Sequence, residues 1–521
     1  MTINTISLTY CHCVELRGNR LSFKNKHEQD ARATKEKIIQ MSRQELIKNE
    51  AYVNGQWVQG KSTFDVVNPS TGSVVEKIAD LMVTEVHDAV ATAYKVWTVF
   101  KASDVALRAS LLENWYRLIL EHKQELAEIM TLESGKPLVE SLGEVDYGAS
   151  FVLWFAEESK RCYGETIPAP RTSNKILTIK QSIGVVAAIT PWNFPLAMVT
   201  RKVAPAIAAG CTVVLRPASQ TPLTALALAV LAEKAGWPAG IFNVVTGTDS
   251  SGIGYELSTN PLIRKLSFTG STGIGKVLMK QAAENVKKVS LELGGNAPFI
   301  VFDDAAIEAA VEGAIFAKFR NTGQTCVAVN RFLVQDTIFD QFSRRLTEAV
   351  KALKVGNGLD SGVQIGPVVN KKGLDKVQEH IADAVEKGAR ILTGGHVIDR
   401  LFYAPTVLAD VPQEALIAKE ETFGPVASLF RFKTEEEAIK IANDTEFGLA
   451  AYFYSNNIHR CWRVAESLEA GMVGVNEGRI SFAGAPFGGI KESGVGREGS
   501  RYGLDEYVEL KYINFSVAEG S

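Results

Sequence analysis

The stretch GVVAAITPWNFPLAMVTRKVAPAIAAGCTVVLRPASQTP, residues 184–222, contains two short β-branched runs separated by an alanine-rich helical segment. The same alternation continues to about residue 291. Uninterrupted apolar strands that alternate with helices are typical of a parallel sheet covered on both faces. We therefore predict a doubly wound α/β domain whose ligands bind at the carboxyl ends of its strands. The expected strands are 184–190, 212–216, 241–247, 264–270 and 289–293, and the expected helices are 200–209, 222–235, 252–258 and 275–284.

A second α/β region is expected from about residue 296 to residue 475, where further strand and helix patterns alternate. Two other segments, 174–181 and 506–516, alternate apolar and polar residues as half-exposed strands do. An exposed strand edge needs a partner, so we expect a homo-oligomer, either a dimer or a tetramer. The predicted organisation is a dinucleotide-binding domain (46–165 and 182–292), a catalytic domain (293–499), a small β oligomerisation arm (166–181 and 500–521) and an N-terminal extension (1–45).

Composition limits the classes of function. A chain of 521 residues is too long for one hydrophobic core, which predicts two or three domains. The net charge of -3 favours neither nucleic acid nor a membrane surface as a partner. Six cysteines in so long a chain are typical of reduced thiols, so we expect a cytoplasmic protein ahead of one in the mitochondrial matrix.

The N-terminal 40 residues are polar and poorly patterned. We interpret them as a disordered extension or as a reading frame begun upstream of a true start at Met41. Cys11, His12 and Cys13 are consecutive, and three successive ligands do not easily wrap one tetrahedral ion. We therefore expect no metal site in the protein.

The segment FTGSTGIGKV, residues 268–277, is one residue away from a phosphate-binding loop of nucleotide triphosphatases. Val277 stands where a Ser or Thr should bind Mg²⁺, and the spacing is not that of the standard dinucleotide fingerprint. The loop follows a predicted strand and opens a predicted helix, so Gly270, Ser271 and the helix N-terminus can face a phosphate. An ordinary glycine-rich turn is the alternative, and the loop alone does not decide between them.

The end of the strand at 212–216 bears on the choice of cofactor. In dinucleotide-binding folds, an acidic residue here binds the ribose 2′-hydroxyl, whereas a cation accommodates a 2′-phosphate. This chain has Arg216 and Ser219 at that place, with no carboxylate in the segment RPASQTP. The pattern favours NADP over NAD, and a solvated arginine at a strand end is the alternative.

Three residues have the chemistry of a catalytic centre. Cys326 in NTGQTCVAV lies at a turn whose N–H groups could stabilise a thiolate, although an isolated cysteine is more often a small buried hydrophobe. Glu292 in SLELGGNAP stands between leucines at a strand end, where burial would raise its pKa and suit a general base; a solvent-facing edge position is the alternative. Asn193 in TPWNFP could donate to an oxyanion.

With these motifs the chain resembles the aldehyde dehydrogenase superfamily over nearly all of residues 46–518. The matching stretches are TPWNFP, RPASQTP, FTGSTGIG, LELGGNAP, GQTC, EETFGPV and PFGGIKESGVGREG. Within the superfamily it is most similar to the succinate-semialdehyde dehydrogenases, notably in WFAEESKR and FAKFRNTGQTCV. The resemblance implies NAD(P)-dependent oxidation of succinate semialdehyde to succinate, a place in GABA degradation and a homotetramer. Glutarate semialdehyde, or aliphatic aldehydes in general, is the alternative substrate.

The resemblance also implies a role for each matching residue. Cys326 would attack the aldehyde, Asn193 and the Cys326 N–H would bind the oxyanion, and Glu292 would activate water to hydrolyse the thioester. Because Glu292 is present, a CoA-acylating enzyme is not expected. The remaining implied residues are Trp192, Arg216, Ser219, Gly270, Ser271, Glu421 and Phe423 for the cofactor, and Arg161, Arg320 and Ser481 for the substrate carboxylate.

The chain departs from the similar enzymes at two places. Arg479, in NEGRISFAGAPFGG, stands where they usually have an aliphatic residue, and Phe482 begins a less polar stretch. This loop helps to shape the substrate entrance, so the preference between four-carbon and five-carbon substrates is open. Ala328 stands where several relatives have a second cysteine, so no disulfide between such neighbours is expected at Cys326.

Overall fold

The computed structural model describes residues 41–516. The tripeptide Cys11-His12-Cys13, and most of the predicted N-terminal extension, lie outside the described residues. The extension was predicted to reach residue 45, but a short helix, α2 (Arg43–Leu46), already belongs to the folded part. Leu46 is buried and Arg43 forms an ion pair with Glu128, so this helix is packed on the folded part. Between residues 41 and 516, no helix is long and apolar enough to cross a membrane.

The first large sheet has five parallel central strands in the order β9, β8, β7, β10 and β11. Each corresponds to a predicted strand, and the predicted α/β class is confirmed. All five residues of β7 are buried, as expected for a strand covered on both faces. In sheet order the strands are β2 (Gln56–Val58), β1 (Ala51–Val53), β9 (Phe242–Val244), β8 (Thr212–Arg216), β7 (Val185–Ile189), β10 (Ile263–Thr269), β11 (Lys288–Glu292) and β23 (Gly494–Val495).

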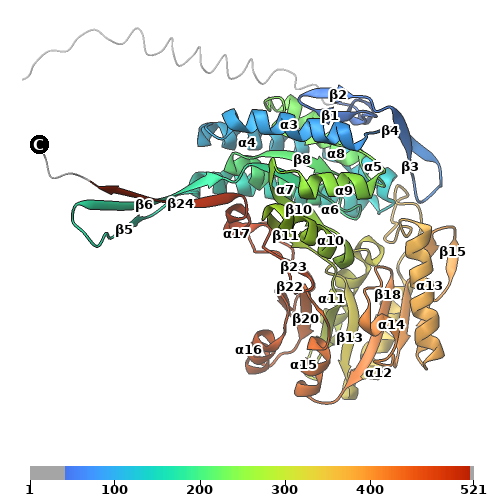
Figure 1. Ribbon diagram of the computed structural model, residues 1–521. Helices are drawn as coiled ribbons and strands as arrows, with labels where there is room; N and C mark the ends of the chain where they lie inside the picture. The colour runs from blue at the N-terminus through green and yellow to red at the C-terminus, as the bar shows by residue number, and fades with distance from the viewer. Residues whose placement is uncertain (1–40, 517–521) are drawn as a thin grey trace, which may run out of the picture. The chain divides into compact units, whose positions relative to one another are not determined.

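Helices from two parts of the chain pack around this sheet (Figure 1). The crossover helices are α7 (Ala197–Ala209), α8 (Leu223–Lys234), α9 (Ser250–Thr259) and α10 (Thr272–Ala282). The helical region at 105–134 is divided at His122, whose φ of -106° and ψ of 28° end one helix and begin the next. The N-terminal helices are α3 (Val83–Phe100), α4 (Val105–Glu121), α5 (Lys123–Ser134) and α6 (Leu138–Glu158), of which α6 was not predicted and packs on α4 and α7.

The second large sheet separates two hydrophobic clusters. Along β12, Phe299 and Val301 belong to one cluster, whereas Ile300 and the following Phe302 belong to the other. This period of two follows from the alternating direction of side chains in a strand. Helices α11 (Ile307–Phe319) and α12 (Phe339–Lys351) cover one face, and α13 (Lys371–Glu386), α15 (Glu435–Asn443) and α16 (Ile458–Ser467) cover the other. The strand order is β14 (Arg390–Thr393), β17 (Thr406–Ala409), β18 (Val426–Phe432), β13 (Val329–Gln335), β12 (Ala297–Val301), β20 (Ala450–Tyr454) and β21 (Met472–Val475).

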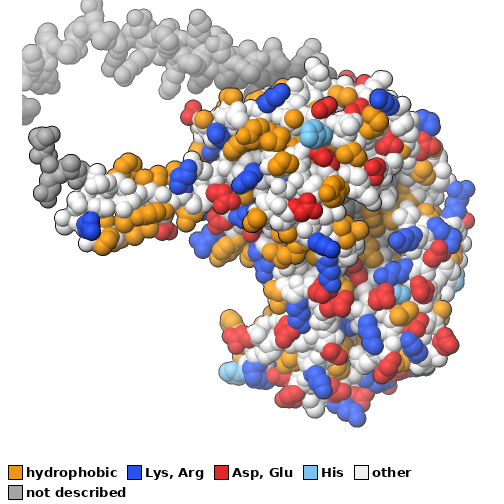
Figure 2. All heavy atoms as spheres, viewed as in Figure 1, with side chains coloured by type: hydrophobic (Ala, Val, Ile, Leu, Met, Phe, Trp, Pro, Cys, Tyr) orange, Lys and Arg blue, Asp and Glu red, His pale blue; other side chains and the backbone are white. Residues whose placement is uncertain are grey.

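A smaller sheet contains the two segments that were predicted as half-exposed strands. Its strands are β24 (Val508–Ser516), β6 (Asn174–Ser182) and β5 (Thr166–Ile167), all antiparallel, and they lie apart from the two large sheets in Figure 1. Figure 2 shows apolar side chains along this sheet, and Leu510 and Tyr512 of β24 are 66% and 59% exposed. The sheet places an apolar strand at an open edge. The predicted domain limits stay a prediction, although β23 joins the first sheet from within the range assigned to the catalytic domain.

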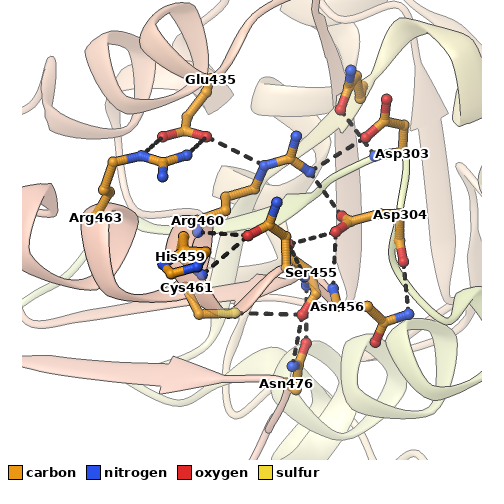
Figure 3. Close-up of polar contacts among 12 residues, drawn as sticks. Asp303, Asp304, Glu435, Ser455, Asn456, His459, Arg460, Cys461, Arg463 and Asn476 are labelled. Carbon is orange, nitrogen blue, oxygen red and sulfur yellow. Dashed lines mark hydrogen bonds and ion pairs between the residues drawn. The ribbon is translucent and has the colours of Figure 1, made fainter.

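A cluster of charged side chains fastens α15 and α16 to the end of β12 (Figure 3). Arg460 lies between the carboxylates of Asp304, at 2.8 Å, and Glu435, at 3.2 Å. Its guanidinium also lies over the ring of Phe302, 4.6 Å from the centroid. The Nε and Nη1 of Arg460 thus both have carboxylate partners, and the described residues contain no group of three potential metal ligands. The cluster therefore connects α15 and α16 to the segment that follows β12 and has a structural role.

Candidate active site

Four predicted site segments meet where neighbouring parallel strands end. Asn193 follows β7, Gly270 follows β10, Glu292 ends β11 and Arg216 ends β8. In the sheet, Thr269 and Glu292 are register partners, and the Gly270 N–H donates to the Glu292 carbonyl at 3.1 Å. The carboxyl ends of parallel strands are the usual ligand-binding edge of such sheets. The anion loop and the candidate base are therefore adjacent because their strands are paired.

The second sheet contributes residues that precede its strands. Cys326 comes shortly before β13 and Glu421 shortly before β18, and these two strands are neighbours. The chain reaches Cys326 through a tight turn in which Asn321 and Thr322 both have left-handed φ values, 51° and 59°. Gly295 passes so close that a Cβ there would lie 2.6 Å from the Cys326 carbonyl oxygen. The glycine of LGGN is thus required for the first sheet to approach the cysteine loop.

Asn193 is held in place by buried hydrogen bonds. Its Nδ2 donates to the backbone carbonyl of Gln324 at 3.0 Å. The backbone carbonyl of Asn193 accepts from Lys136 Nζ at 2.7 Å and from Asn321 Nδ2 at 3.0 Å. Lys136 also pairs with Glu144, whose carboxylate accepts the N–H groups that begin α7. An amide has two N–H donors, and the bond to Gln324 uses one. The second is available to a developing oxyanion next to the cysteine loop.

The environment of Cys326 favours the neutral thiol. The pKa of Cys326 is raised to about 12, chiefly by burial and also by the nearby carboxylates of Glu421 and Glu292, against the lowering effects of Arg201 and Arg320. A turn whose N–H groups stabilise a thiolate was predicted here. Stabilisation of a thiolate by this turn stays a prediction, because the loss of water around the sulfur here outweighs the surrounding positive charge. Nucleophilic attack therefore needs a base or a bound cation.

Glu292 is the base that the site provides. Burial raises the pKa of Glu292 well above its ordinary value; the neighbouring Glu498 raises it as well, and Arg201, Lys202 and Arg497 oppose the shift. The side chain is 3% exposed and its Oε2 has no hydrogen-bond partner. A buried carboxyl with one free oxygen and a raised pKa can accept a proton from water. The predicted environment of Glu292 is thus observed.

Sequence reasoning missed three charged residues of this centre. Arg201 and Lys202, adjacent on α7, are both fully buried and pair with the two oxygens of the Glu498 carboxylate. Arg201 also lies over the rings of Phe151 and Phe487, with its Cζ 5.1 and 4.1 Å from their centroids, and its Nη2 has no hydrogen-bond partner. Two cations inside an otherwise apolar helical segment were the available signal, because buried charges are rare without a partner or a role.

The anion loop is built for a phosphate without a metal. Ser271 is the N-cap of α10, is exposed and uses its hydroxyl for no cap bond, so the helix N-terminus and this hydroxyl are both free. Lys276 points elsewhere: its Nζ pairs with Glu492 at 2.6 Å on the surface. In a triphosphatase loop that lysine would contact the phosphates. Gly275 is buried, and a glycine is needed there because a Cβ would lie 2.4 Å from the Leu293 side chain.

Arg216 and Ser219 lie on the other side of this edge. Ser219 lines a cavity of about 690 Å³ together with Gln220 and Thr248. Arg216 is almost buried, and its Nη2 donates to the Gly247 carbonyl at 3.2 Å and to Ser250 Oγ at 2.8 Å. Its Nε is buried without a partner, so the guanidinium retains a free donor.

Three further predicted cofactor residues lie together. The rings of Trp192 and Phe423 meet edge to face with centroids 5.5 Å apart, and Phe423 has a left-handed φ of 55°. Glu421 accepts the Gly295 N–H at 3.3 Å. Burial raises the pKa of Glu421 to about 7, and the Gly295 bond and two lysines, Lys376 and Lys318, lower it.

A second cavity, of about 180 Å³, contains two of the three predicted substrate residues. Arg320 and Ser481 line it, beside Thr325 and Val327, the two neighbours of Cys326. Arg161 is not among the lining residues. Its side chain is 50% exposed and pairs with Glu158 at 2.8 Å, so the guanidinium is already engaged at the surface. The structure does not bring Arg161 to this cavity, and its substrate role stays a prediction.

Comparison with known proteins agrees with this arrangement. The model of the aldehyde dehydrogenase family matches residues 57–513. The chain is 56% identical over 472 residues to the NADP(+) succinate-semialdehyde dehydrogenase of Escherichia coli, covering 90% of this chain and 98% of that protein. It is 55% identical over 481 residues to a glutarate-semialdehyde dehydrogenase of Pseudomonas putida, covering 92% and 100%. The crystal structure of an NADP-dependent enzyme of Escherichia coli superposes with a TM-score of 0.90 at 55% identity, covering 91% and 99%. The chain belongs to the aldehyde dehydrogenase family.

Proposed function

We propose that the protein oxidises succinate semialdehyde to succinate with NADP as the preferred cofactor. One observation carries the proposal. A half-buried cysteine, a buried base and an oriented amide converge beside a cavity that contains an arginine with no ion-pair partner among residues 41–516. The thiol and base suit acyl chemistry at an aldehyde, and the arginine suits an acid group at the far end of the substrate.

The residues divide the reaction into two halves. In the first, the sulfur of Cys326 passes its proton to a water molecule and forms a bond to the aldehyde carbon as the carbonyl π bond breaks, and the carbonyl oxygen becomes an oxyanion that accepts from Asn193 Nδ2 and the Cys326 N–H. Bound dinucleotide supplies the acceptor for the hydride of that carbon, which leaves a thioester on Cys326. In the second half, Glu292 takes a proton from water, the water oxygen attacks the thioester carbon, and the thiolate leaves as the acid forms.

The cofactor side fits a dinucleotide with a 2′-phosphate. Arg216 has a buried, unpartnered Nε at the strand end where the ribose is expected, and Ser219 adds a hydroxyl. The free N-terminus of α10 and Ser271 would hold the pyrophosphate. Asp249 is the carboxylate that acts on Arg216, but its side chain caps α9 through the Gly252 N–H at 2.8 Å. Because the Asp249 carboxylate is engaged in this cap, the Arg216 guanidinium can bind the 2′-phosphate.

The substrate carboxylate would bind to Arg320 and Ser481. Arg201 is a further candidate, because its Nη2 is buried, unpartnered and near enough to lower the pKa of Cys326. Arg161 is retained as a prediction that the experiment below tests. We do not favour the glutarate alternative, since the Escherichia coli relative named for succinate semialdehyde is the more identical of the two.

We also propose that the chain forms a homo-oligomer, a dimer or a tetramer, through the sheet of β5, β6 and β24. Its support is the open edge of β24 with exposed apolar side chains. Light scattering of the purified protein tests the assembly, and a monomer would contradict it.

A cytoplasmic location and a place in GABA degradation belong to the same proposal, and subcellular fractionation and growth of a deletion strain on GABA test them.

A kinetic matrix tests the function. Succinate semialdehyde, glutarate semialdehyde and butanal are each assayed with NADP and with NAD, and succinate semialdehyde with NADP should have the highest kcat/KM. Arg320→Leu should lower kcat/KM for both acids by about tenfold or more and leave butanal unchanged, because a lost charge-assisted contact costs about 1.5–3 kcal/mol. Arg161→Leu tests the retained prediction: a loss for both acids would support a substrate role, and unchanged kcat/KM values would contradict it. Equal rates for butanal and the acids would contradict the proposed substrate.

The cofactor preference has its own variant. Ser219→Glu introduces a carboxylate that repels a 2′-phosphate and can accept from a 2′-hydroxyl. We expect the ratio of kcat/KM for NADP to that for NAD to fall by about a hundredfold, the size of two strong polar contacts. A wild-type enzyme that strongly prefers NAD would contradict the role given to Arg216 and Ser219.

A further inference from the structure

The substrate cavity contains a second arginine that the proposed function does not use. Arg479 lines it together with Arg320 and Ser481. The guanidinium of Arg479 lies over Phe316 with its Cζ 4.3 Å from the ring centroid, and the Cζ of Arg320 lies 5.2 Å from the same centroid. The ring of Phe316 therefore contacts both guanidinium groups at this cavity. The sum of the two distances is an upper limit on the separation of the two Cζ atoms.

Neither arginine forms an ion pair with a carboxylate of the described residues. Within residues 41–516, neither Arg320 nor Arg479 has a carboxylate within the 4.0 Å of an ion pair. The acids around them are engaged with backbone groups. Glu477 accepts the N–H of Arg479 at 2.7 Å, and Glu140, whose carboxyl feels the charge of Arg320, accepts the N–H of Asn321 at 2.7 Å. The cavity therefore carries two positive charges that a ligand can offset.

Two cations at one cavity set the charge of the ligand that fits best. Like charges at this range repel, and an anion between them relieves the repulsion. A single carboxylate offsets one of the two charges, whereas a group with two negative charges offsets both and has enough oxygen atoms for two guanidinium groups. Arg320 is half-buried and Arg479 is exposed, so the inner and outer sides of such a group would each meet one arginine.

We propose that Arg479 is a specificity-determining residue that makes the enzyme prefer aldehydes whose remote end carries a dianionic group, such as a phosphonate or a phosphate ester. The inference rests on the proposed function, in which this cavity binds the acid end of a semialdehyde. An aliphatic residue at position 479 would leave one cation and favour a single carboxylate. The arginine of this chain adds charge without closing the site to succinate semialdehyde.

The test separates charge from shape. Four aldehydes of similar length are compared: succinate semialdehyde, its analogues with sulfonate or phosphonate in place of the carboxylate, and butanal. Sulfonate and phosphonate are both tetrahedral, but only phosphonate carries two negative charges, at a pH above its second ionisation. We expect the wild-type kcat/KM for the phosphonate to exceed that for the sulfonate by about tenfold, the effect of one additional charged contact.

Variants at position 479 complete the test. Arg479→Leu should remove the phosphonate advantage over the sulfonate, Arg479→Lys should keep most of it, and butanal should not change with either. Because the side chain is exposed, neither variant is expected to unfold the protein. If the wild type distinguishes the acids from butanal but Arg479→Leu leaves the phosphonate-to-sulfonate ratio unchanged, only this inference fails. If the wild type does not distinguish the acids from butanal, the proposed function fails, and this inference with it.

Discussion

Glu292→Gln is the substitution that tests the division of labour in the site most directly. Glutamine has the shape of glutamate but cannot accept a proton from water. Because Glu292 Oε2 has no hydrogen-bond partner and the side chain is 3% exposed, the change breaks no observed contact at that oxygen. It also removes an acid that raises the pKa of Cys326. The first half of the reaction should therefore continue while hydrolysis of the thioester stops.

The size of the effect follows from the role. A positioned general base contributes about 10²–10⁴-fold to a rate, so steady-state kcat should fall by that factor. Rapid mixing with succinate semialdehyde and NADP should still give a burst of NADPH of about one equivalent per active site. Mass spectrometry of the quenched variant should find the acyl group on Cys326. A variant with unchanged kcat would refute the assignment of Glu292 as the hydrolytic base.

A second readout uses stability. A carboxyl whose pKa is raised by folding binds protons more tightly in the native state, so native stability falls as the pH rises through and above its ordinary value of 4.5. Glutamine does not titrate, so the melting temperature of Glu292→Gln should exceed that of the wild type increasingly as the pH rises above 4.5.

Three further variants test other parts of the site. Arg201→Met removes a cation that lowers the pKa of Cys326, so the pH dependence of Cys326 alkylation should move to higher pH, and Arg201→Lys should restore it; an unmoved profile would contradict this role. Lys276→Ala should change the free energy of unfolding by less than about 1 kcal/mol and leave the KM for NADP within about twofold, because its partner is the surface Glu492; a large rise in KM would mean that the lysine binds phosphate. Gly295→Ala places a methyl group 2.6 Å from the Cys326 carbonyl, so kcat should fall by about tenfold or more while circular dichroism stays native; full activity would show that this loop can shift.

Much of this protein could be predicted from local patterns. The five central strands of the first sheet were predicted close to their observed limits, because a fully buried parallel strand has an apolar run that no neighbouring segment imitates. Cys326, Glu292 and Asn193 were recognised because each stands in a short motif at a strand end or turn. The edge strand β24 was predicted because its alternation is a property of the strand itself. α6 and the break at His122 were not predicted, because the helical pattern continues across several helices.

Only the tertiary structure decided how charged residues behave. The sequence analysis named Arg161 and missed Arg201, yet Arg161 pairs with Glu158 in solvent, whereas Arg201 is buried and lowers the pKa of Cys326. The raised pKa of Cys326 depends on how many segments exclude water from the sulfur, which no local motif records. In the same way, Arg479 gains its significance from Phe316, far away in the chain, whose ring it shares with Arg320. Local sequence determined the elements and the chemical groups; desolvation and charge pairing, which come from distant segments, decided what those groups can do.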